Sequence, residues 1–108
     1  MDIKRITAVF PESLEDSFER CLRKCGVPGM TIDKVRGFGE HANYFSDDLL
    51  KSNIRAVIYV GEQRAGALVE ALQEFALEEH TTSGIVVVET VERLIKLHTG
   101  ADVELGLS

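Results

Sequence analysis

The stretch NIRAVIYV, residues 53–60, is the clearest strand in the sequence and decides the fold. Apolar side chains alternate along it with the period of two that an extended chain imposes. One face carries four apolar residues, which are Ile54, Ala56, Ile58 and Val60. The other face carries Arg55, Val57 and Tyr59. We expect the first face to line a core, and the apolar Val57 and Tyr59 predict that another subunit covers the second.

The chain downstream of this strand predicts a helix and a further strand. After Gly61, apolar residues recur with the 3.6-residue period of a helix that ends near Glu79. These residues are Ala65, Leu68, Val69, Leu72, Phe75 and Ala76. A polar run from His80 to Gly84 then leads into IVVV, residues 85–88, which is typical of a strand buried on both faces.

The chain upstream predicts a strand, a helix and a second strand before a long loop. Residues 3–10 are rich in apolar and β-branched side chains, and the strand ends where Pro11 removes a hydrogen-bond donor. A helical stripe follows, made of Leu14, Phe18, Cys21, Leu22 and Cys25. Gly26 ends this helix, residues 30–36 form the next strand, and residues 37–53 form the loop.

Strand, helix, strand, strand, helix, strand is the ferredoxin-like βαββαβ arrangement. It is an α+β fold with four antiparallel strands and both helices on one side of the sheet. The length of 108 residues predicts a single domain over residues 1–108. Within it we distinguish the loop 37–53 and a C-terminal tail, 99–108. Long loops inside compact domains are usually functional, so we expect the function to lie in the loop.

Composition excludes several classes of function. The formal charge of −6 argues against binding to nucleic acid, because that binding needs clustered cations. No apolar run approaches the roughly 20 residues that cross a bilayer, so we expect no membrane insertion and a cytoplasmic protein. Cys21 and Cys25 lie one helical turn apart, and a pair alone cannot complete a tetrahedral metal shell, so we interpret them as buried thiols.

Known catalytic motifs are not found in the sequence, which has no nucleophile elbow, zinc-protease helix or P-loop, so we do not expect an enzyme. Two glycine-containing elements instead suggest anion binding. Gly37-Phe38-Gly39 leaves a strand and can present backbone NH groups to an anion. The run Thr81-Thr82-Ser83-Gly84 offers hydroxyl and NH groups at the edge of another strand.

Four motifs carry a resemblance to a known family. They are RITAVFP at residues 5–11, CGVPGMT at 25–31, VRGFG at 35–39 and KLHTG at 96–100. In order and spacing they resemble the PII signal-transduction family over nearly the whole chain. The resemblance implies a homotrimer that binds an adenine nucleotide in each of three clefts between neighbours and requires no cofactor. It also implies that the loop changes conformation with the ligand and docks onto a transporter, enzyme or regulator.

The resemblance also implies which residues form the cleft. One subunit would supply Gly37, Phe38, Gly39, Glu40 and the turn Thr82, Ser83, Gly84. Its neighbour would supply Gly29, Met30, Thr31, Lys96 and His98. The residues of the loop that would meet the partner protein are His41, Asn43, Tyr44 and Phe45.

Departures from the family pattern narrow the set of ligands and functions that we expect for this chain. Nitrogen sensors have Arg-Gln after the G-F-G motif, where this chain has Glu40-His41, so 2-oxoglutarate sensing is not expected. Their loop is longer and carries a tyrosine in a modifiable motif, whereas Tyr44 stands in an unrelated context, so uridylylation is not expected either. The lysine that usually follows the glycine turn is Ile85, and Lys96 and His98 replace two arginines. Fewer phosphate contacts favour AMP or ADP over ATP. The pattern resembles the divergent PII-like branch associated with bicarbonate transport or carboxysomes, which implies a small anion such as bicarbonate and a role in inorganic carbon or nitrogen metabolism.

Two alternatives stay open at this point. A metal-binding trimer of the copper-tolerance type could use His41, His80, Cys21 or Cys25 as ligands. A small enzyme acting on a phosphorylated substrate could use Glu40 and His41 as acid and base, although neighbouring side chains in an extended chain point apart.

Overall fold

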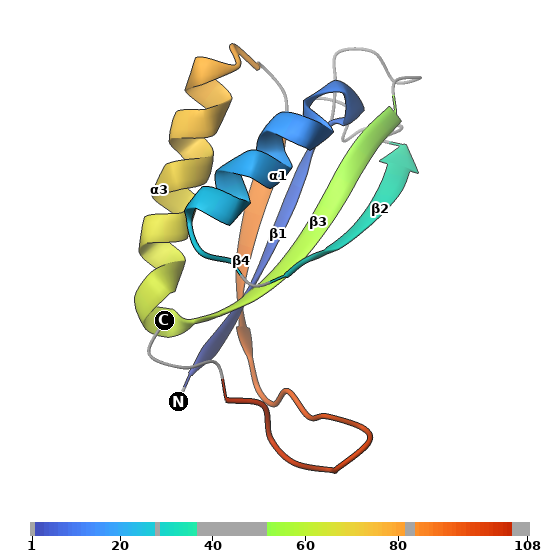
Figure 1. Ribbon diagram of the computed structural model, residues 1–108, viewed down its shortest axis with the longest axis vertical. Coiled ribbons are helices and arrows are strands. Elements are labelled where there is room, and N and C mark those ends of the chain that lie inside the picture. The colour runs from blue at the N-terminus through green and yellow to red at the C-terminus, as the bar shows by residue number, and fades with distance from the viewer. Residues whose placement is uncertain (1, 28, 37–51, 82–83, 105–108) are drawn as a thin grey trace.

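The computed structural model describes residues 2–27, 29–36, 52–81 and 84–104. Its elements follow one another in the expected order (Figure 1). They are β1 (Ile3–Pro11), a 3₁₀ turn (Glu12–Leu14), α1 (Glu15–Lys24), β2 (Thr31–Arg36), β3 (Ser52–Gly61), α3 (Glu62–Glu78) and β4 (Ile85–Val91).

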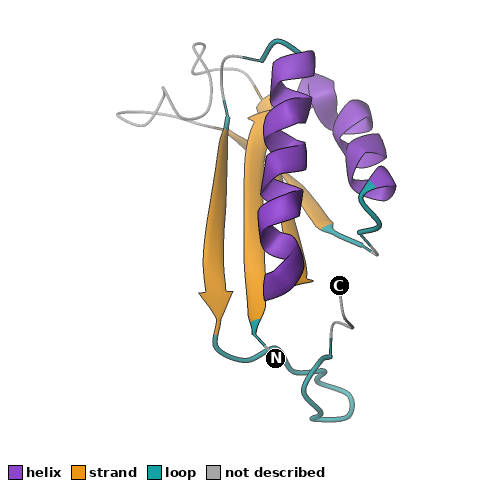
Figure 2. Ribbon diagram, turned by 90° about the vertical axis from the view of Figure 1, so that its left-hand side faces the viewer, coloured by secondary structure: helices purple, strands orange, loops and turns teal. Residues whose placement is uncertain are grey.

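The four strands form one antiparallel sheet in the order β2-β3-β1-β4. Both helices lie on the same face of this sheet, and the opposite face is open in a single copy of the chain (Figure 2). The predicted ferredoxin-like βαββαβ fold is therefore confirmed. The two central strands are β3 and β1, which pair along their whole length from Ile3 and Gly61 to Pro11 and Asn53.

The core lies between the sheet and the two helices, and it forms because the alternation in β3 and the helical stripes face each other. Ile6, Ile54 and Ile58 are fully buried at its centre. The helices cover them with Phe18, Leu22, Ala65, Leu68, Leu72 and Phe75. Phe18 stacks on Phe10 of β1 and makes an edge contact with Phe75 of α3, so a row of aromatic rings links β1, α1 and α3.

The end of α1 is fixed by glycine and by a contact from α3. Gly26 adopts a φ of 77°, and the amide of Val27 donates to the carbonyl of Leu22 at 3.2 Å, which is the bond pattern of a glycine-terminated helix. The guanidinium of Arg64 donates to the carbonyl of Cys25. The chain therefore leaves α1 along a defined path into β2.

The prediction that residues 85–88 are buried on both faces is wrong. β4 extends to Val91, and Val86, Val87 and Val88 are between 38% and 46% exposed. The reason is topological, because β4 lies at an edge of the sheet, where neither helix fully covers it. A run of apolar residues indicates a strand but does not reveal whether that strand is central.

Smaller boundaries also differ from the prediction. Ser52 and Asn53 belong to β3, so the loop between β2 and β3 is shorter than residues 37–53. Leu14 lies in the 3₁₀ turn and not in the helix. Cys21 and Cys25 were expected to be buried, but both are partly exposed, because α1 is amphipathic and its stripe is narrower than predicted.

The open face of the sheet carries apolar side chains between ion pairs. Val57 is partly buried and Tyr59 is exposed, as predicted from their alternation. Beside them, Arg55 donates two hydrogen bonds to Asp33, at 2.6 and 3.1 Å. Among the described helices, neither is both long and apolar enough to span a membrane.

Candidate functional site

Two of the predicted glycine elements flank strands that end at the same end of the sheet. Arg36, the last residue of β2, pairs with Ser52, and Ile85 at the start of β4 pairs with Val9. The G-F-G motif follows the first of these positions and the predicted anion-binding turn precedes the second. Both elements therefore leave the sheet on the side where β1 and β2 end and β3 and β4 begin.

They leave it from opposite edges, however. In the order β2-β3-β1-β4, two strands separate β2 from β4. Three inter-strand spacings of about 4.8 Å amount to roughly 14 Å. In one copy of the chain, the Arg36 end of β2 and the Gly84 end of β4 thus lie at opposite edges of the sheet.

Gly84 begins the half-site at the β4 edge. Its φ is 120°, and a Cβ atom at this position would lie 2.7 Å from the carbonyl oxygen of Val9. Real Cβ atoms do not approach a backbone oxygen that closely, so the fold itself requires glycine here. Gly84 is consequently packed directly against the end of β1.

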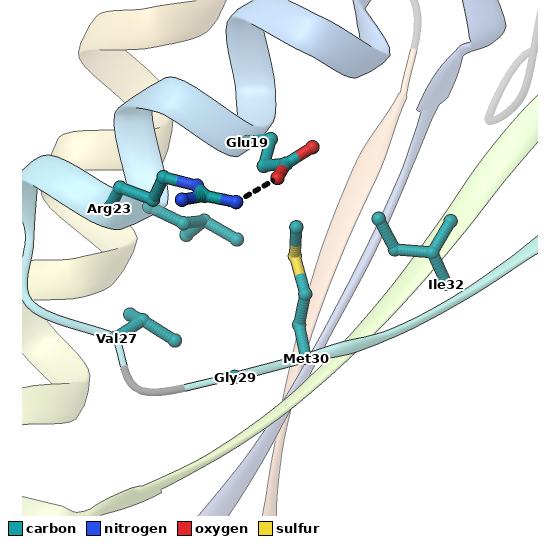
Figure 3. Close-up of a pocket in the computed structure, with 7 residues that line it drawn as sticks. Glu19, Arg23, Val27, Gly29, Met30 and Ile32 are labelled. Atoms are coloured by element: carbon teal, nitrogen blue, oxygen red, sulfur yellow. Dashed lines mark hydrogen bonds and ion pairs between the residues drawn. The ribbon is translucent and has the colours of Figure 1, made fainter.

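Gly29, Met30 and Thr31 form a second half-site on the β2 edge, at the opposite end of the strand from Arg36, because Thr31 begins β2. A Cβ added to Gly29 would meet nothing within 4 Å, so the fold of a single copy does not require glycine there. Gly29 and Met30 border a hollow of about 440 Å³ between α1 and β2, which we call the α1–β2 hollow (Figure 3). Thr31 is exposed and pairs with Val57, which places it on the open face of the sheet.

The sequence alone did not reveal the other walls of the α1–β2 hollow. They are Glu19, Leu22, Arg23, Val27 and Ile32. Figure 3 shows the Met30 side chain pointing into the hollow, with Arg23 and Glu19 joined by an ion pair at its rim. That pair is spaced i, i+4 on the helix that precedes the G-M-T motif, which is the one signal in the sequence that could have identified it.

Lys96 and His98 lie in a hairpin-like turn beyond the far end of β4, which extends away from the sheet (Figure 1). The backbone of Lys96 is fixed on both sides, because its amide donates to Ala101 at 2.9 Å and its carbonyl accepts from Gly100 at 2.7 Å. Both side chains are exposed. Within one copy they are at the opposite end of β4 from Gly84.

The remaining predicted residues lie outside the described part of the chain. In the cleft these are Gly37, Phe38, Gly39, Glu40, Thr82 and Ser83, and in the loop His41, Asn43, Tyr44 and Phe45. Their assignments stay predictions.

One charged contact ties β2 to the start of the first helical segment. Lys34 of β2 bonds the carboxylate of Glu12 at 2.8 Å. This hydrogen bond, together with the charge of Glu12, raises the pKa of the Lys34 ammonium. The pair is exposed, so it orients β2 near its loop end more than it stabilises the fold.

Comparison with known families decides where the chain belongs. The family model described as "Nitrogen regulatory protein P-II" matches residues 3–101, which span the sheet, both helices and the hairpin-like turn. The chain belongs to the P-II family. The resemblance of the four sequence motifs is thereby confirmed.

Curated P-II relatives match nearly their whole length. The nitrogen regulatory protein P-II of Pasteurella multocida is 31% identical over 94% of this chain and 97% of its own. The corresponding protein of Rhizobium meliloti is 28% identical over 97% of both chains. These relatives are named as regulators, which favours a regulatory P-II chain over the small-enzyme alternative.

Solved structures place the chain near a divergent P-II-like branch. The structure of CPII from Thiomonas intermedia K12 bound to ADP, AMP and acetate has a TM-score of 0.68 and 25% identity, over 83% of this chain and 86% of that one. A second structure of CPII, described as a nitrogen regulatory PII-like protein bound to ADP, AMP and bicarbonate, has a TM-score of 0.66 and 24% identity, covering 84% of this chain and 91% of that one. Because its sequence identity is 24%, the second match supports only the fold.

The copper-tolerance alternative receives no support from these matches. Within the described ranges of this P-II chain, no three His, Cys, Asp or Glu side chains are grouped so that they could hold a metal ion. His41, one of its supposed ligands, is outside those ranges.

Proposed function

We propose that the chain is a ligand-sensing regulator that binds an adenine nucleotide in clefts between the copies of a homotrimer. The observation that carries the proposal is the match to CPII bound to ADP and AMP, which comes with membership of the P-II family over residues 3–101. The protein acts in the cytoplasm as a regulator and not as a catalyst.

The placement of the half-sites supports a cleft shared between copies. Gly84 precedes β4 at one edge of the sheet, whereas Gly29 and Met30 precede β2 at the other edge and at the opposite end of the strands, with β3 and β1 between them. A nucleotide that contacts both sets must be held by the β4 edge of one copy and the β2 edge of the next. Lys96 and His98 would reach the same cleft from the extended turn.

The open face of the sheet supports the trimer. It exposes Tyr59 and Val87 while its charges are already paired, Arg55 with Asp33 and Arg5 with Glu89. A face that is apolar and electrically balanced suits contact with a second copy of itself better than contact with a charged partner.

AMP and ADP are favoured over ATP because the described cleft residues include few cations. Ile85 follows Gly84 where the family pattern has a lysine, and of Lys96 and His98, which replace two arginines, only Lys96 is a permanent cation. Hydrogen bonds to charged groups contribute about 1.5 to 3 kcal/mol each, so a missing cation weakens the hold on a third phosphate most.

We further propose that loop residues 37–51 report the bound state to a partner protein, a transporter, enzyme or regulator of inorganic carbon or nitrogen metabolism. A small anion such as bicarbonate is the expected co-ligand, and acetate in the CPII structure is a small carboxylate of similar size and charge. A segment that orders on ligand binding is a common way to transmit such a signal.

Isothermal titration with AMP, ADP and ATP tests the nucleotide proposal. We expect heat from AMP and ADP and a weaker response to ATP. The absence of heat from all three, up to about 1 mM nucleotide, would sink the proposal, since it limits the binding free energy to less than about 4 kcal/mol. Analytical ultracentrifugation of the same sample tests the trimer separately.

A glycine pair tests the position of the cleft. The Gly29→Ala variant is expected to fold normally, because its Cβ meets open space in a single copy, but to bind ADP at least severalfold more weakly. Gly66→Ala is the matched control, since Gly66 is also exposed with open space around it but lies on α3. Equal ADP affinity of the two variants would remove Gly29 from the site.

A further inference from the structure

Cys21 and Cys25 form a pair of thiols that the proposed nucleotide cleft does not use. Cys21 lies in the last turns of α1 and Cys25 is its C-cap, so their spacing of four places them on one face of the helix. Both are free and partly exposed. They are the two cysteines of the whole chain, so no third thiol of the chain competes with them.

The pair lines a groove of about 330 Å³ between α1 and α3, on the helical side of the molecule. The thiol of Cys21 lies 4.0 Å from the carbonyl oxygen of Ala71 in α3 and donates a weak hydrogen bond to it. Arg20 and Lys24 stand beside the thiols on α1, and three carboxylates, Glu74, Glu78 and Glu79, line the groove from α3 and its end. The groove thus carries charges of both signs and is open to a small polar reagent.

Burial raises the pKa of the Cys21 thiol, and Cys25, which lies within hydrogen-bonding reach of it, raises the pKa further. Cys21 is therefore held as a thiol and reacts slowly with an external reagent, because the thiolate is the nucleophile. Its closeness to Cys25 instead suits it to an intramolecular second step, in which proximity compensates for weak ionisation.

We propose that Cys21 and Cys25 are a thiol–disulfide modification site, at which a small-molecule disulfide such as oxidised glutathione converts the pair to an intrachain disulfide. In the first step the sulfur of Cys25, after loss of its proton, attacks oxidised glutathione, forms a mixed disulfide and releases one glutathione thiolate. In the second step Cys21 loses its proton and attacks the sulfur of Cys25, which releases the second glutathione. Two protein thiols are oxidised and one glutathione disulfide is reduced.

Closing this disulfide must alter the end of α1. Side chains four apart on a regular helix have Cβ atoms about 5–6 Å apart, whereas a disulfide needs about 3.5–4.5 Å. The terminal turn has to move, and with it the hydrogen bond from Val27 to Leu22 and the contact of Arg64 with the Cys25 carbonyl. A disulfide that is strained in this way is also easily reduced, so the modification is reversible.

The movement reaches the α1–β2 hollow, because Val27 lines it together with Met30. The redox state of Cys21 and Cys25 thus changes the path of the chain from α1 into β2. An effect on nucleotide affinity would rest on the proposed function, whereas the disulfide itself and the displacement of Val27 do not.

Intact-mass spectrometry of the reduced full-length protein, incubated with oxidised glutathione under native conditions, tests the site. We expect the wild type to lose the mass of two hydrogen atoms and to remain without an intermolecular disulfide on a non-reducing gel. A persistent glutathione adduct, a disulfide between chains, or unchanged thiols would each overturn the proposal. In the Cys21→Ser variant the reaction should stop at a single glutathione adduct, which shows that Cys21 closes the ring.

The order of attack has its own control. Cys25→Ser leaves only Cys21, whose pKa is raised by burial, and should react severalfold more slowly than Cys21→Ser, and equal rates would contradict the assigned order. Hydrogen exchange then tests, without any nucleotide, whether the disulfide alters the α1–β2 hollow through Val27. The amide of Val27 is expected to exchange roughly tenfold faster in the oxidised protein, because its bond to Leu22 is disturbed. Unchanged exchange of the Val27 amide would show that the disulfide does not alter the α1–β2 hollow.

Discussion

The two faces of the same sheet contrast sharply in what they contain. On the helical face, Ile6, Ile54 and Ile58 are completely buried under α1 and α3. On the open face, the ion-paired Arg55 is followed by Val57 and Tyr59 along the same strand, β3. The comparison teaches that a single strand serves folding with one half of its side chains and is free to serve assembly with the other half.

The helical face should be the more sensitive to substitution. Ile58→Ala is expected to lower the free energy of unfolding by about 2 to 5 kcal/mol, because it removes buried methylene groups and leaves a cavity between β3 and the helices. Urea denaturation at a fixed protein concentration measures this. Leu77→Ala, at a position that is 75% exposed, is the control and should change stability by less than about 0.5 kcal/mol. If both variants lose equal stability, the claim that the buried residues of the helical face determine stability is wrong.

The open face should respond through assembly and not through the fold of one copy. Val57→Asp is expected to cost the single copy about 1 kcal/mol, the span of strand preferences, while a carboxylate buried between copies would prevent the trimer from forming. Sedimentation velocity should show smaller species with an unchanged circular dichroism spectrum. Leu77→Asp introduces the same charge on α3 and should leave the assembly intact. A trimeric Val57→Asp variant would mean that another surface joins the copies.

The ion pair of the open face should matter least for stability. Arg55→Met removes two hydrogen bonds to Asp33, but both side chains are nearly half exposed, so the expected loss is a few tenths of a kcal/mol and at most about 1 kcal/mol. The difference from wild type should shrink in 1 M salt, where charges are screened within about 3 Å. A loss that exceeds that of Ile58→Ala would show that the open face, and not the core, determines stability.

Much of the fold could be predicted because its signals are local. The alternation in residues 53–60 and the helical period after Gly61 each identify an element and its buried face. Pro11 and Gly26 mark a strand end and a helix end through their backbone preferences. The family motifs added the expectation of a shared cleft, which no local pattern contains.

What could not be predicted depends on position within the sheet. Residues 85–88 read as a doubly buried strand, yet their exposure follows from the edge position of β4, which is set by contacts distant in sequence. For the same reason the α1–β2 hollow was missed, since Arg23 and Met30 come together only when the helix packs beside the strand. The sequence also could not show that sterics within one chain require glycine at Gly84 but not at Gly29.

The close approach of Gly84 to the carbonyl of Val9 bears on how related sequences should be compared. Glycine at this position is demanded by sterics and would persist in a descendant that had lost its ligand altogether. Gly29 has no such constraint within one chain, so ligand or neighbour alone would preserve it. Across an evolutionary tree, position 29 is therefore the better record of whether the cleft is still in use.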